Sequence, residues 1–455
     1  MARGARPLAR RPVTRILTAI VAVGVVALVG GGLLLDTPKV KGALRRVVYG
    51  RPAPELPGHW NPVQTRTASS ISDRDREKRI RKLLSLGYSG TSHHVGADAG
   101  VIILDEERAA PGLRFFVSGH APEAALMERD GRIVHTWTYD YTDLWRSRPV
   151  DFMPPVPATG CWRRAHLMDD GSLLAVYEGH GLVKLDRDSN VLWAYAGKCH
   201  HDLDIGPDGS IVVLTRDARV EPRFHPEEPV LLDSVTFLDS EGRLQLRIDL
   251  LNAFEHSPFA DLLPKAPASG DLFHTNTLEL LDGRLAERSE AFRAGNVLIS
   301  VRELDLLAVL DPRFGRIVWA RRGPWSRQHE PTILADGHML LFDNLEQGGR
   351  SRVLEFDPFT LETVWTYADG PETPLYSPTC GAARRLPCGN TLIVESDNGR
   401  AFEVTPDGEV VWEFVNPYRG GADGELIAAV MDMEVLPADI PLDWLSSDPT
   451  RVSLR

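Results

Sequence analysis

Residues 199–216 read CHHDLDIGPDGSIVVLTR and carry the pattern that decides the fold. The pair Asp208-Gly209 separates two apolar stretches, and such a pair is a strong hairpin signal because both residues tolerate positive φ. The same turn recurs along the chain as Asp170-Gly171, Asp282-Gly283 and Asp336-Gly337, with Gly389-Asn390 in the same role. The chain is therefore predicted to contain repeated antiparallel hairpins.

Each hairpin belongs to a larger unit that closes with a Gly-x-x-x-Trp segment. The closing residues are Trp137, Trp193, Trp319, Trp365 and Trp412, with Leu246 replacing tryptophan in one unit. Their spacings are 56, 53, 73, 46 and 47 residues, and the longest contains two extra segments, near 252–270 and 284–295. Four-strand units of this length are typical of propeller blades. We predict an all-β, six-bladed β-propeller over residues 96–440. Another blade count or a pair of β-sandwiches are the alternatives.

The two ends of the propeller are expected to complete its ring. An apolar stretch around 426–436 is predicted to pair with the first strands, near Val101. Residues 441–455 are expected to form a C-terminal tail. Residues 36–95 are expected to be a linker that contains a short helix at 73–86.

The charge of the chain is unevenly distributed. Residues 1–50 contain nine Lys/Arg and one acid, or +8, whereas the whole chain carries −12, which leaves −20 on the remainder. So acidic a main body is a poor partner for nucleic acid. Residues 16–35 form an uncharged run of 20 residues behind a basic segment, 1–15. This pattern predicts a transmembrane anchor with 1–15 in the cytoplasm and the main body outside it. A cleaved signal peptide is the alternative.

Cysteine is sparse, with four residues and no Cys-x-x-Cys spacing that would indicate zinc or a redox pair. Cys161 and Cys199 each stand ten residues before a turn glycine. On neighbouring blades they would be placed to form a disulfide, an option that export from the cytoplasm would permit.

Histidines and arginines recur at matching distances from the turns. Counting back eight or nine residues from a turn glycine finds Arg163, His200, His201, His274 and His329, and counting forward seven finds Arg216, Arg302 and Asn344. The first set begins the innermost strands and the second ends their hairpin partners, so both sets lie at one edge of the sheets. They are predicted to surround one funnel on one face of the propeller.

Guanidinium groups hold fixed charge and match tetrahedral oxyanions, while imidazoles near neutral pH act as nucleophile, base or donor. The chain has no Gly-x-Ser-x-Gly, no His-Glu-x-x-His and no carboxylate cluster suited to calcium or magnesium. A pocket for sulfate, phosphate or carboxylate, without metal or other cofactor, is therefore predicted. Zinc or copper on three histidines is the alternative, which neighbouring arginines oppose.

The chain resembles the arylsulfotransferases of the bacterial arylsulfate sulfotransferase type over residues 80–440. Residues 100–112, GVIILDEERAAPG, resemble the opening strand of that family, and 118–124, SGHAPEA, resemble its next segment. The resemblance implies a six-bladed propeller in the periplasm or outside the cell. It implies transfer of a sulfuryl group from a phenolic sulfate ester to another phenol, without a nucleotide donor and through a transiently sulfated histidine.

The resemblance also implies roles for individual residues. His329, within Gln-His-Glu, matches the nucleophile, Arg302 matches the pocket arginine, and His274 with Asn276 match a His-x-Asn motif. His201 is preferred to His200 for the remaining catalytic histidine. The residues expected to bind substrate are Asn276, Arg216, His200, Asn344 and Arg163. Glu330 stands where the family would have aspartate, and the insertion between His274 and Arg302 is longer than expected.

The predicted partners are a small aryl sulfate and a phenol, and the oligomeric state is left open. Two other classes of function remain. One is a non-catalytic, membrane-tethered propeller that serves as a binding or assembly module, because a fold alone does not imply an activity. The other is a quinone-dependent dehydrogenase propeller, against which the lack of a calcium-type carboxylate cluster argues.

Overall fold

A computed structural model describes residues 60–62, 99–145, 160–224, 229–267, 270–345, 349–368, 375–421 and 424–447. The chain divides into two compact units, Met1–Glu55 and Leu56–Arg455, and every described residue belongs to the second. The predicted segments 1–15 and 16–35 and the predicted helix at 73–86 lie outside the described residues. Within the described ranges, no helix combines the length and apolar character needed to span a membrane.

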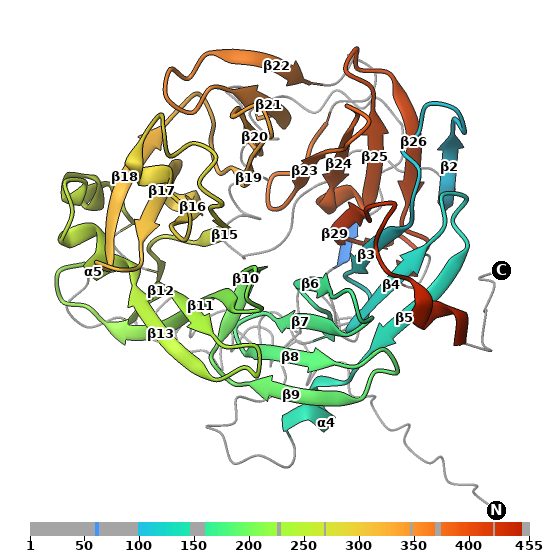
Figure 1. The fold of residues 1–455 in the computed structure, drawn as a ribbon, viewed down its shortest axis with the longest axis horizontal. Helices are drawn as coiled ribbons and strands as arrows, with labels where there is room; N and C mark the ends of the chain where they lie inside the picture. Colours follow the sequence, from blue (N-terminus) through green and yellow to red (C-terminus); the bar gives the residue numbers. More distant parts are fainter. Residues whose placement is uncertain are drawn as a thin grey trace, which may run out of the picture. The chain divides into compact units, whose positions relative to one another are not determined.

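Six antiparallel sheets form the blades of a β-propeller, which confirms the predicted fold (Figure 1). From the innermost strand outward, blade 1 is β29 (Val430–Val435), β3 (Arg114–Ser118), β4 (Glu123–Met127) and β5 (Ile133–Thr138), and blade 2 is β6 (Arg164–Leu167), β7 (Leu173–Tyr177), β8 (Gly181–Leu185) and β9 (Val191–Tyr195). Blade 3 is β10 (Cys199–Ile205), β11 (Ile211–Val220), β12 (Pro229–Leu238) and β13 (Leu244–Asp249), and blade 4 is β15 (Thr275–Leu280), β16 (Val297–Val301), β17 (Leu306–Asp311) and β18 (Arg316–Arg322). Blade 5 is β19 (His329–Ile333), β20 (Met339–Asp343), β21 (Arg352–Phe356) and β22 (Thr363–Tyr367), and blade 6 is β23 (Ala382–Arg385), β24 (Thr391–Glu395), β25 (Arg400–Val404), β26 (Val410–Val415) and β2 (Gly100–Leu104).

The ring closes differently from the prediction. The C-terminal strand β29 does complete a blade, but it pairs with β3, with Val430 opposite Ser118. The strand near Val101, β2, instead pairs with β26 as a fifth strand on the outer side of blade 6, with Gly100 opposite Val415. The predicted partner of the tail was therefore wrong. Both ends of the propeller are held by strand pairing, which protects edges that would otherwise expose unpaired backbone groups.

The turn glycines and closing tryptophans have the roles that the repeat predicted. Gly171 and Gly337 adopt φ of 79° and 89°, as an Asp-Gly hairpin turn requires. The indole of Trp137 donates to the carbonyl oxygen of Gly171 at 3.0 Å, and that of Trp412 donates to the carbonyl oxygen of Arg129 at 2.9 Å. Both acceptors belong to the following blade, and both tryptophans are fully buried. The tryptophans therefore fill and connect the interfaces between blades.

Two insertions and one small sheet add to the blades. After β13 the chain forms α5 (Leu250–Glu255), a 3-10 helix η2 (Ala260–Lys265) and β14 (Gly270–Asp271), which pairs in parallel with β12. The β15–β16 connection carries the 3-10 helix η3 (Glu290–Phe292), whose Phe292 is buried. A short helix α4 (Tyr141–Trp145) follows β5, 3-10 helices η4 (Arg302–Leu304) and η5 (Ser396–Asn398) follow β16 and β24, and η6 (Asp443–Ser447) lies in the predicted tail.

Part of the predicted linker is a strand. β1 (Trp60–Pro62) pairs with β28 (Leu426–Ala428), which also pairs with β27 (Arg419–Gly420). Outside the linker, the sequence left open a disulfide between Cys161 and Cys199. Cys199 is a buried thiol without a disulfide, so the possible bridge to Cys161 is not formed.

Candidate active site

The predicted residues of blades 2 to 5 meet at one edge of the innermost strands. The rings of His201 and His274, from blades 3 and 4, lie 4.8 Å apart between centroids, and His200 lies 5.1 Å from His201. The charges of Arg302 and Arg163 act on His329 of blade 5, and that of Arg163 acts on His201 as well. We call this group, His200, His201, His274, His329, Arg163 and Arg302, the pocket cluster.

The backbone at this edge is unusual at matching positions of three blades. Lys198, His274 and Arg327 stand just before or at the start of the innermost strands and have φ of 55°, 46° and 55°. His201 and Glu330 are left-handed too, at 54° and 49°. Such conformations in non-glycine residues cost about 1–3 kcal/mol each and gather at functional sites. None of the five is a glycine, so composition offered no signal for them.

His329 is held in one orientation and one tautomer. Its Nδ1 lies 2.7 Å from Asn344 Oδ1 and 3.1 Å from the carbonyl oxygen of Arg327. The Asn344 amide nitrogen donates to the carbonyl oxygens of Ser377 and Cys380, at 2.6 and 2.8 Å, which directs Oδ1 toward the ring. Because both neighbours of Nδ1 accept, Nδ1 carries the proton and Nε2 has the lone pair.

The Nε2 atom of His329 is buried and has no hydrogen-bond partner among the described residues. Burial, followed by the charges of Arg302 and Arg163, lowers the pKa of His329 well below its usual range. The imidazole is therefore neutral at physiological pH. A neutral, oriented imidazole with an unshared lone pair has the form that a nucleophile requires.

Two arginines of the cluster keep donors that no described residue satisfies. Arg302 donates from Nη1 to Glu303, but its buried Nε has no partner within the described ranges. Arg327 donates to the same Glu303 oxygen at 2.8 Å. Burial and then the positive charge of Arg327 lower the pKa of Arg302. The side chain of Arg163 forms no hydrogen bond or ion pair with any described residue. Unsatisfied guanidinium donors beside a neutral imidazole favour an oxyanion ligand.

His274 is oriented by Asp271, a residue that the sequence analysis missed. The ring Nδ1 lies 3.0 Å from Asp271 Oδ2, and the His274 backbone N–H donates to Oδ1 at 2.9 Å. Burial alone would raise the pKa of Asp271, but the hydrogen bond and charge of His274 outweigh it and lower the pKa to about 2. Asp271 lies only three residues before His274, and that spacing was the available signal.

Arg216 was predicted to bind substrate, yet its guanidinium is already paired. Its Nη2 lies 3.1 Å from Glu178 Oε1, while Glu178 Oε2 accepts the His201 backbone N–H at 3.0 Å. Ligand atoms of Glu178, His200 and His201 lie within 4.8 Å of one another, which is close enough for a metal ion. Because Arg216 pairs with Glu178 and the charge of Arg163 adds to the repulsion of a cation, we assign no metal to this group.

The two predicted asparagines support the nucleophile segment from within the protein. The Asn276 amide nitrogen donates to the carbonyl oxygen of Gln328 at 2.8 Å, and its oxygen accepts from Thr277 at 3.2 Å. Asn344 binds His329 in the manner described above. Their amides therefore position Gln328 and His329, a role that differs from the direct substrate binding expected of them.

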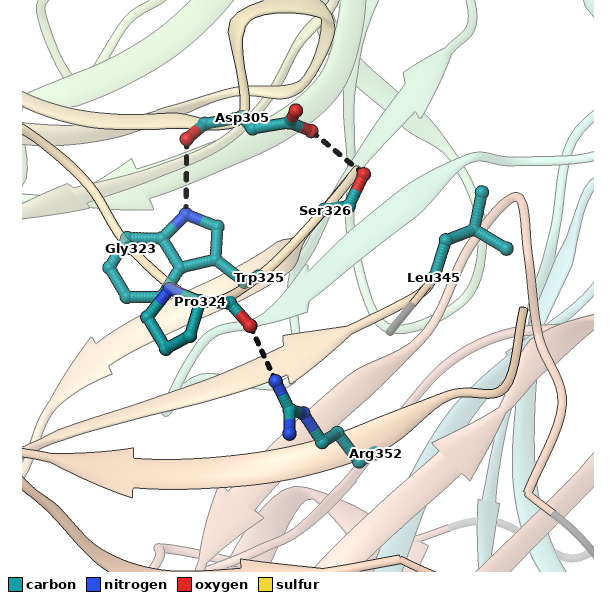
Figure 2. Close-up of a pocket in the computed structure, with 7 residues that line it drawn as sticks. All are labelled: Asp305, Gly323, Pro324, Trp325, Ser326, Leu345 and Arg352. Atoms are coloured by element: carbon teal, nitrogen blue, oxygen red, sulfur yellow. Dashed lines mark hydrogen bonds between the residues drawn. The ribbon is translucent and has the colours of Figure 1, made fainter. Parts of the chain in front are cut away.

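A separate pocket of about 490 Å³ is lined by residues outside the pocket cluster (Figure 2). It is lined by Asp305, Gly323, Pro324, Trp325, Ser326, Leu345 and Arg352. Within it, Trp325 donates to the carbonyl oxygen of Asp305 at 3.2 Å, and the Ser326 hydroxyl donates to the Asp305 carboxylate at 3.1 Å. Leu345 follows Asn344, and Ser326 precedes His329 by three residues, so the pocket adjoins the nucleophile segment without including it.

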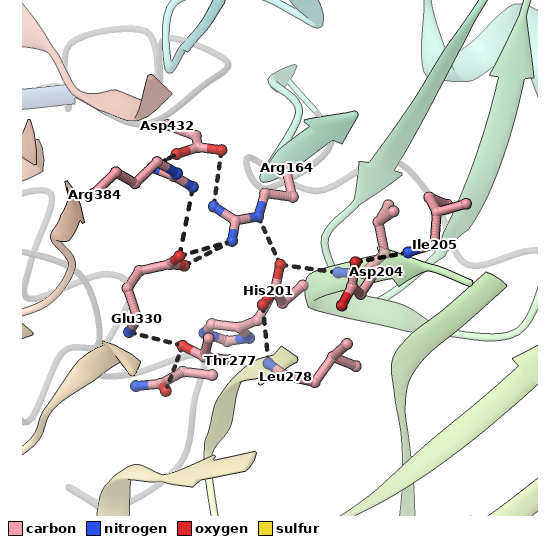
Figure 3. A network of polar contacts seen from close by, with 12 residues as sticks. Arg164, His201, Asp204, Ile205, Thr277, Leu278, Glu330, Arg384 and Asp432 are labelled. Atoms are coloured by element: carbon pink, nitrogen blue, oxygen red, sulfur yellow. Dashed lines mark hydrogen bonds and ion pairs between the residues drawn. The ribbon is translucent and has the colours of Figure 1, made fainter. Parts of the chain in front are cut away.

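A second buried polar group, which we call the axial network, joins the six innermost strands (Figure 3). Arg164 donates to Asp202 at 2.6 Å and to both Glu330 oxygens, at 2.8 and 2.9 Å, and pairs with Asp432 at 2.8 Å. Arg384 pairs with Asp432 at 2.7 Å and with Glu330 at 3.4 Å. Glu330, the departure from the family motif, is thus a member of this network.

Blade 4 joins the axial network through its backbone and a hydroxyl group. Asp202 accepts the Leu278 N–H at 2.9 Å, and the Thr277 hydroxyl accepts the Glu330 N–H at 3.0 Å. The network therefore fixes the residues that directly follow His201 and His329.

No curated protein matches the chain in sequence. A Bacteroides caccae protein of unknown function matches in structure at 13% identity and a TM-score of 0.45, covering 70% of this chain and 99% of that one. A streptogramin B lyase matches at 12% identity and a TM-score of 0.40, covering 74% and 93%. Similarity at this level carries no argument about activity.

The sequence itself identifies the family. The family model described as arylsulfotransferase (ASST) matches residues 164–417, which is more than half of the chain and includes every residue of the pocket cluster except Arg163. The protein therefore belongs to the arylsulfotransferase family.

Proposed function

We propose that this protein is an aryl-sulfate sulfotransferase. It moves a sulfuryl group from a phenolic sulfate ester to a phenolic acceptor in a ping-pong reaction, through a sulfohistidine and without a nucleotide sulfate donor. The observation that carries the proposal is the state of His329. Its Nδ1–H donates to Asn344, and its neutral ring leaves Nε2 without a partner among the described residues, near the charges of Arg302 and Arg163.

In the first half-reaction, Nε2 of His329 attacks sulfur and the bond from sulfur to the phenolic oxygen breaks. The Nδ1–H remains on the ring, so the ring becomes cationic while the attached sulfuryl oxygens carry one negative charge, and Asn344 Oδ1 stabilises the ring proton. In the second half-reaction, the oxygen of the acceptor phenol attacks the same sulfur and restores neutral His329. A histidine of the cluster gives a proton to the leaving oxygen and later takes one from the acceptor.

The arginines hold the sulfuryl oxygens while charge moves between sulfur and the phenolic oxygen. Arg302 has a buried donor to spare, and Arg163 has no other described partner. Donors already aimed at the developing charge need no reorganisation during reaction, and losing one typically lowers kcat about 10²–10³-fold.

The proposed location is outside the cytoplasm, with residues 16–35 as a membrane anchor. The support is the charge pattern of the chain, +8 over residues 1–50 and −20 over the remainder of a total of −12. Protease accessibility in spheroplasts tests this part: the propeller should be digested without permeabilisation. Protection of the propeller until permeabilisation would contradict it.

The proposed activity is tested with 4-nitrophenyl sulfate and a phenol. The purified protein should release nitrophenol in a burst, gain the mass of one sulfuryl group, and lose that mass when phenol is added. His329→Asn should show neither burst nor adduct, while His256→Asn, a change at an exposed histidine outside the cluster, should behave as wild type. Binding of aryl sulfate without any release or adduct in the wild type would favour the non-catalytic propeller instead.

A further inference from the structure

A line of three buried side chains leads from the third strand of blade 3 into the pocket cluster. Asp233 Oδ1 in β12 lies 3.5 Å from His200 Nε2, and His200 Nδ1 lies 2.9 Å from His201 Nδ1. Asp233, His200 and His201 are 0%, 1% and 5% exposed. The ring of His201 then faces that of His274 at 4.8 Å. The line therefore connects a buried carboxyl group in β12 to the pocket cluster.

At the Asp233 end of this line, Asp233 Oδ1 and His200 Nε2 face each other. Asp233 Oδ1 and His200 Nε2 are both buried, and neither forms a hydrogen bond with any described residue. The other Asp233 oxygen is occupied, because it accepts the Thr275 N–H at 2.7 Å. Buried polar atoms in native proteins are rarely unpaired. A proton shared between Oδ1 and Nε2 satisfies both atoms.

The charges around the line put its mobile proton on the carboxyl group. Burial and then the charge of Asp271 raise the pKa of Asp233 to about 8, against the hydrogen bonds from Thr275 and the charge of Arg216, which lower it. Burial and the charge of Arg216 lower the pKa of His200 to about 3.

At the pocket end, burial and then the charges of Arg163, His274, His200 and Arg216 lower the pKa of His201 well below its usual range. Glu178 faces His201 at 3.5 Å and is itself paired with Arg216. His201 is therefore neutral at neutral pH and cannot act as an acid in its imidazolium form.

We propose that Asp233, His200 and His201 form a proton relay for the transfer reaction, an inference that rests on the proposed function. In the first half-reaction, His201 Nε2–H gives its proton to the leaving phenolic oxygen. His201 Nδ1 takes the proton of His200 Nδ1, and His200 Nε2 takes that of Asp233 Oδ1, which becomes a carboxylate. In the second half-reaction, the acceptor phenol gives its proton to His201 Nε2 and each shift reverses. Both imidazoles remain neutral throughout, and no net proton is consumed.

In this scheme Asp233 and His200 are positioning and relay residues, and only His201 touches substrate. A proton donor matters most for a poor leaving group, since 4-nitrophenolate leaves readily without one. The relay is therefore tested by a series of aryl sulfates with phenols of rising pKa. General acid catalysis is typically worth about 10²–10⁴-fold.

The decisive variant is Asp233→Asn, which keeps the acceptor for the Thr275 N–H but has no acidic proton. Single-turnover phenol release should stay within about 3-fold of wild type for 4-nitrophenyl sulfate and fall about 10²-fold or more for phenyl sulfate. A loss of equal size for both substrates indicates a structural role only and overturns the relay. Asp204→Asn, a change in β10 of the same blade at a carboxylate that accepts the Leu280 N–H, is the matched control and should leave both rates unchanged.

His200→Gln keeps the proposal testable if Asp233→Asn fails to fold. It interrupts the relay at its centre and should show the same selective loss with phenyl sulfate, whereas equal rates for wild type and variant across the series would overturn the relay. The experiments distinguish an incorrect relay from an incorrect proposed function. A wild type without burst or sulfuryl adduct refutes the sulfotransferase itself, while an active wild type with non-selective variants refutes only the relay.

Discussion

The pocket cluster and the axial network are both buried, polar and built from the innermost strands, but they differ in how completely their groups are satisfied. In the axial network, the single guanidinium group of Arg164 lies within 2.9 Å of carboxylate oxygens of Asp202, Glu330 and Asp432. In and beside the pocket cluster, His329 Nε2, Arg302 Nε, His200 Nε2 and Asp233 Oδ1 have no hydrogen-bond partner among the described residues. Fully paired buried charges hold a fold together, and unpaired ones are available to a ligand.

Members of the two groups are neighbours in sequence. Three adjacent pairs place the first residue in the pocket cluster and the second in the axial network: Arg163 and Arg164, His201 and Asp202, His329 and Glu330. Adjacent residues of these segments therefore contribute to different groups, so one backbone segment serves both. The network therefore limits the movement of the residues that would meet the substrate.

The largest effect on stability is expected when two adjacent arginines are substituted in turn, Arg164 in the axial network and Arg163 in the pocket cluster. Arg164→Met leaves Asp202, Glu330 and Asp432 with too little positive charge and should lower the free energy of unfolding by about 3–5 kcal/mol. Arg163→Met removes a guanidinium without a described partner and should leave stability unchanged while activity falls. Urea unfolding of both variants measures this, and equal destabilisation would erase the distinction between the two groups.

The next effect concerns the unsatisfied donor of Arg302. Arg302→Met should lower kcat about 10²–10³-fold, equivalent to about 2.7–4 kcal/mol, because a donor aimed at the developing charge is lost. Glu303 keeps Arg327 as its partner, so the thermal unfolding temperature should change little. Steady-state kinetics and a thermal melt give both values. Unchanged kcat would exclude Arg302 from the reaction.

A pH series should detect the neutral histidines of the pocket cluster. The pKa values of His200 and His329 are lowered on folding, to about 3 for His200, so below the unfolded value of about 6.5 the unfolded chain binds more protons. Stability is thus complete above pH 6.5 and falls as pH drops, by about 1.4 kcal/mol per pH unit for each histidine.

Chemical unfolding at pH 6.5 and 5.0 measures this effect. His329→Asn should reduce the loss between these pH values by about 2 kcal/mol. His256→Asn, which alters an exposed histidine, should not. A loss of the same size in His329→Asn and wild type would mean that His329 is not buried in neutral form.

The smallest effect should come from the partner of His329 Nδ1. Asn344→Ala removes the 2.7 Å acceptor, but the Arg327 carbonyl oxygen at 3.1 Å remains and still favours the same tautomer. We expect kcat to fall about 10-fold with KM unchanged, because the ring keeps one acceptor at Nδ1 and loses only part of its orientation. An unchanged kcat would show that Arg327 suffices to orient the ring.

Local patterns in the sequence determined the blades and much of the pocket cluster. The Asp-Gly turns and the closing tryptophans recur from blade to blade. The number of residues between a side chain and its turn predicts at which edge of the sheet that side chain lies. That rule was enough to place His201, His274, His329 and Arg302 together, because an antiparallel hairpin fixes both ends of its strands.

Only the tertiary structure decided which of these groups pair with one another. Arg216 and Arg163 look alike in sequence, yet one contacts Glu178 and the other has no described partner. Asp233 and Asp271 carried no motif, and the strand that closes the ring was assigned the wrong partner. The physical reason is that hydrogen bonds and ion pairs between blades depend on distances set by packing, which no spacing along one strand encodes.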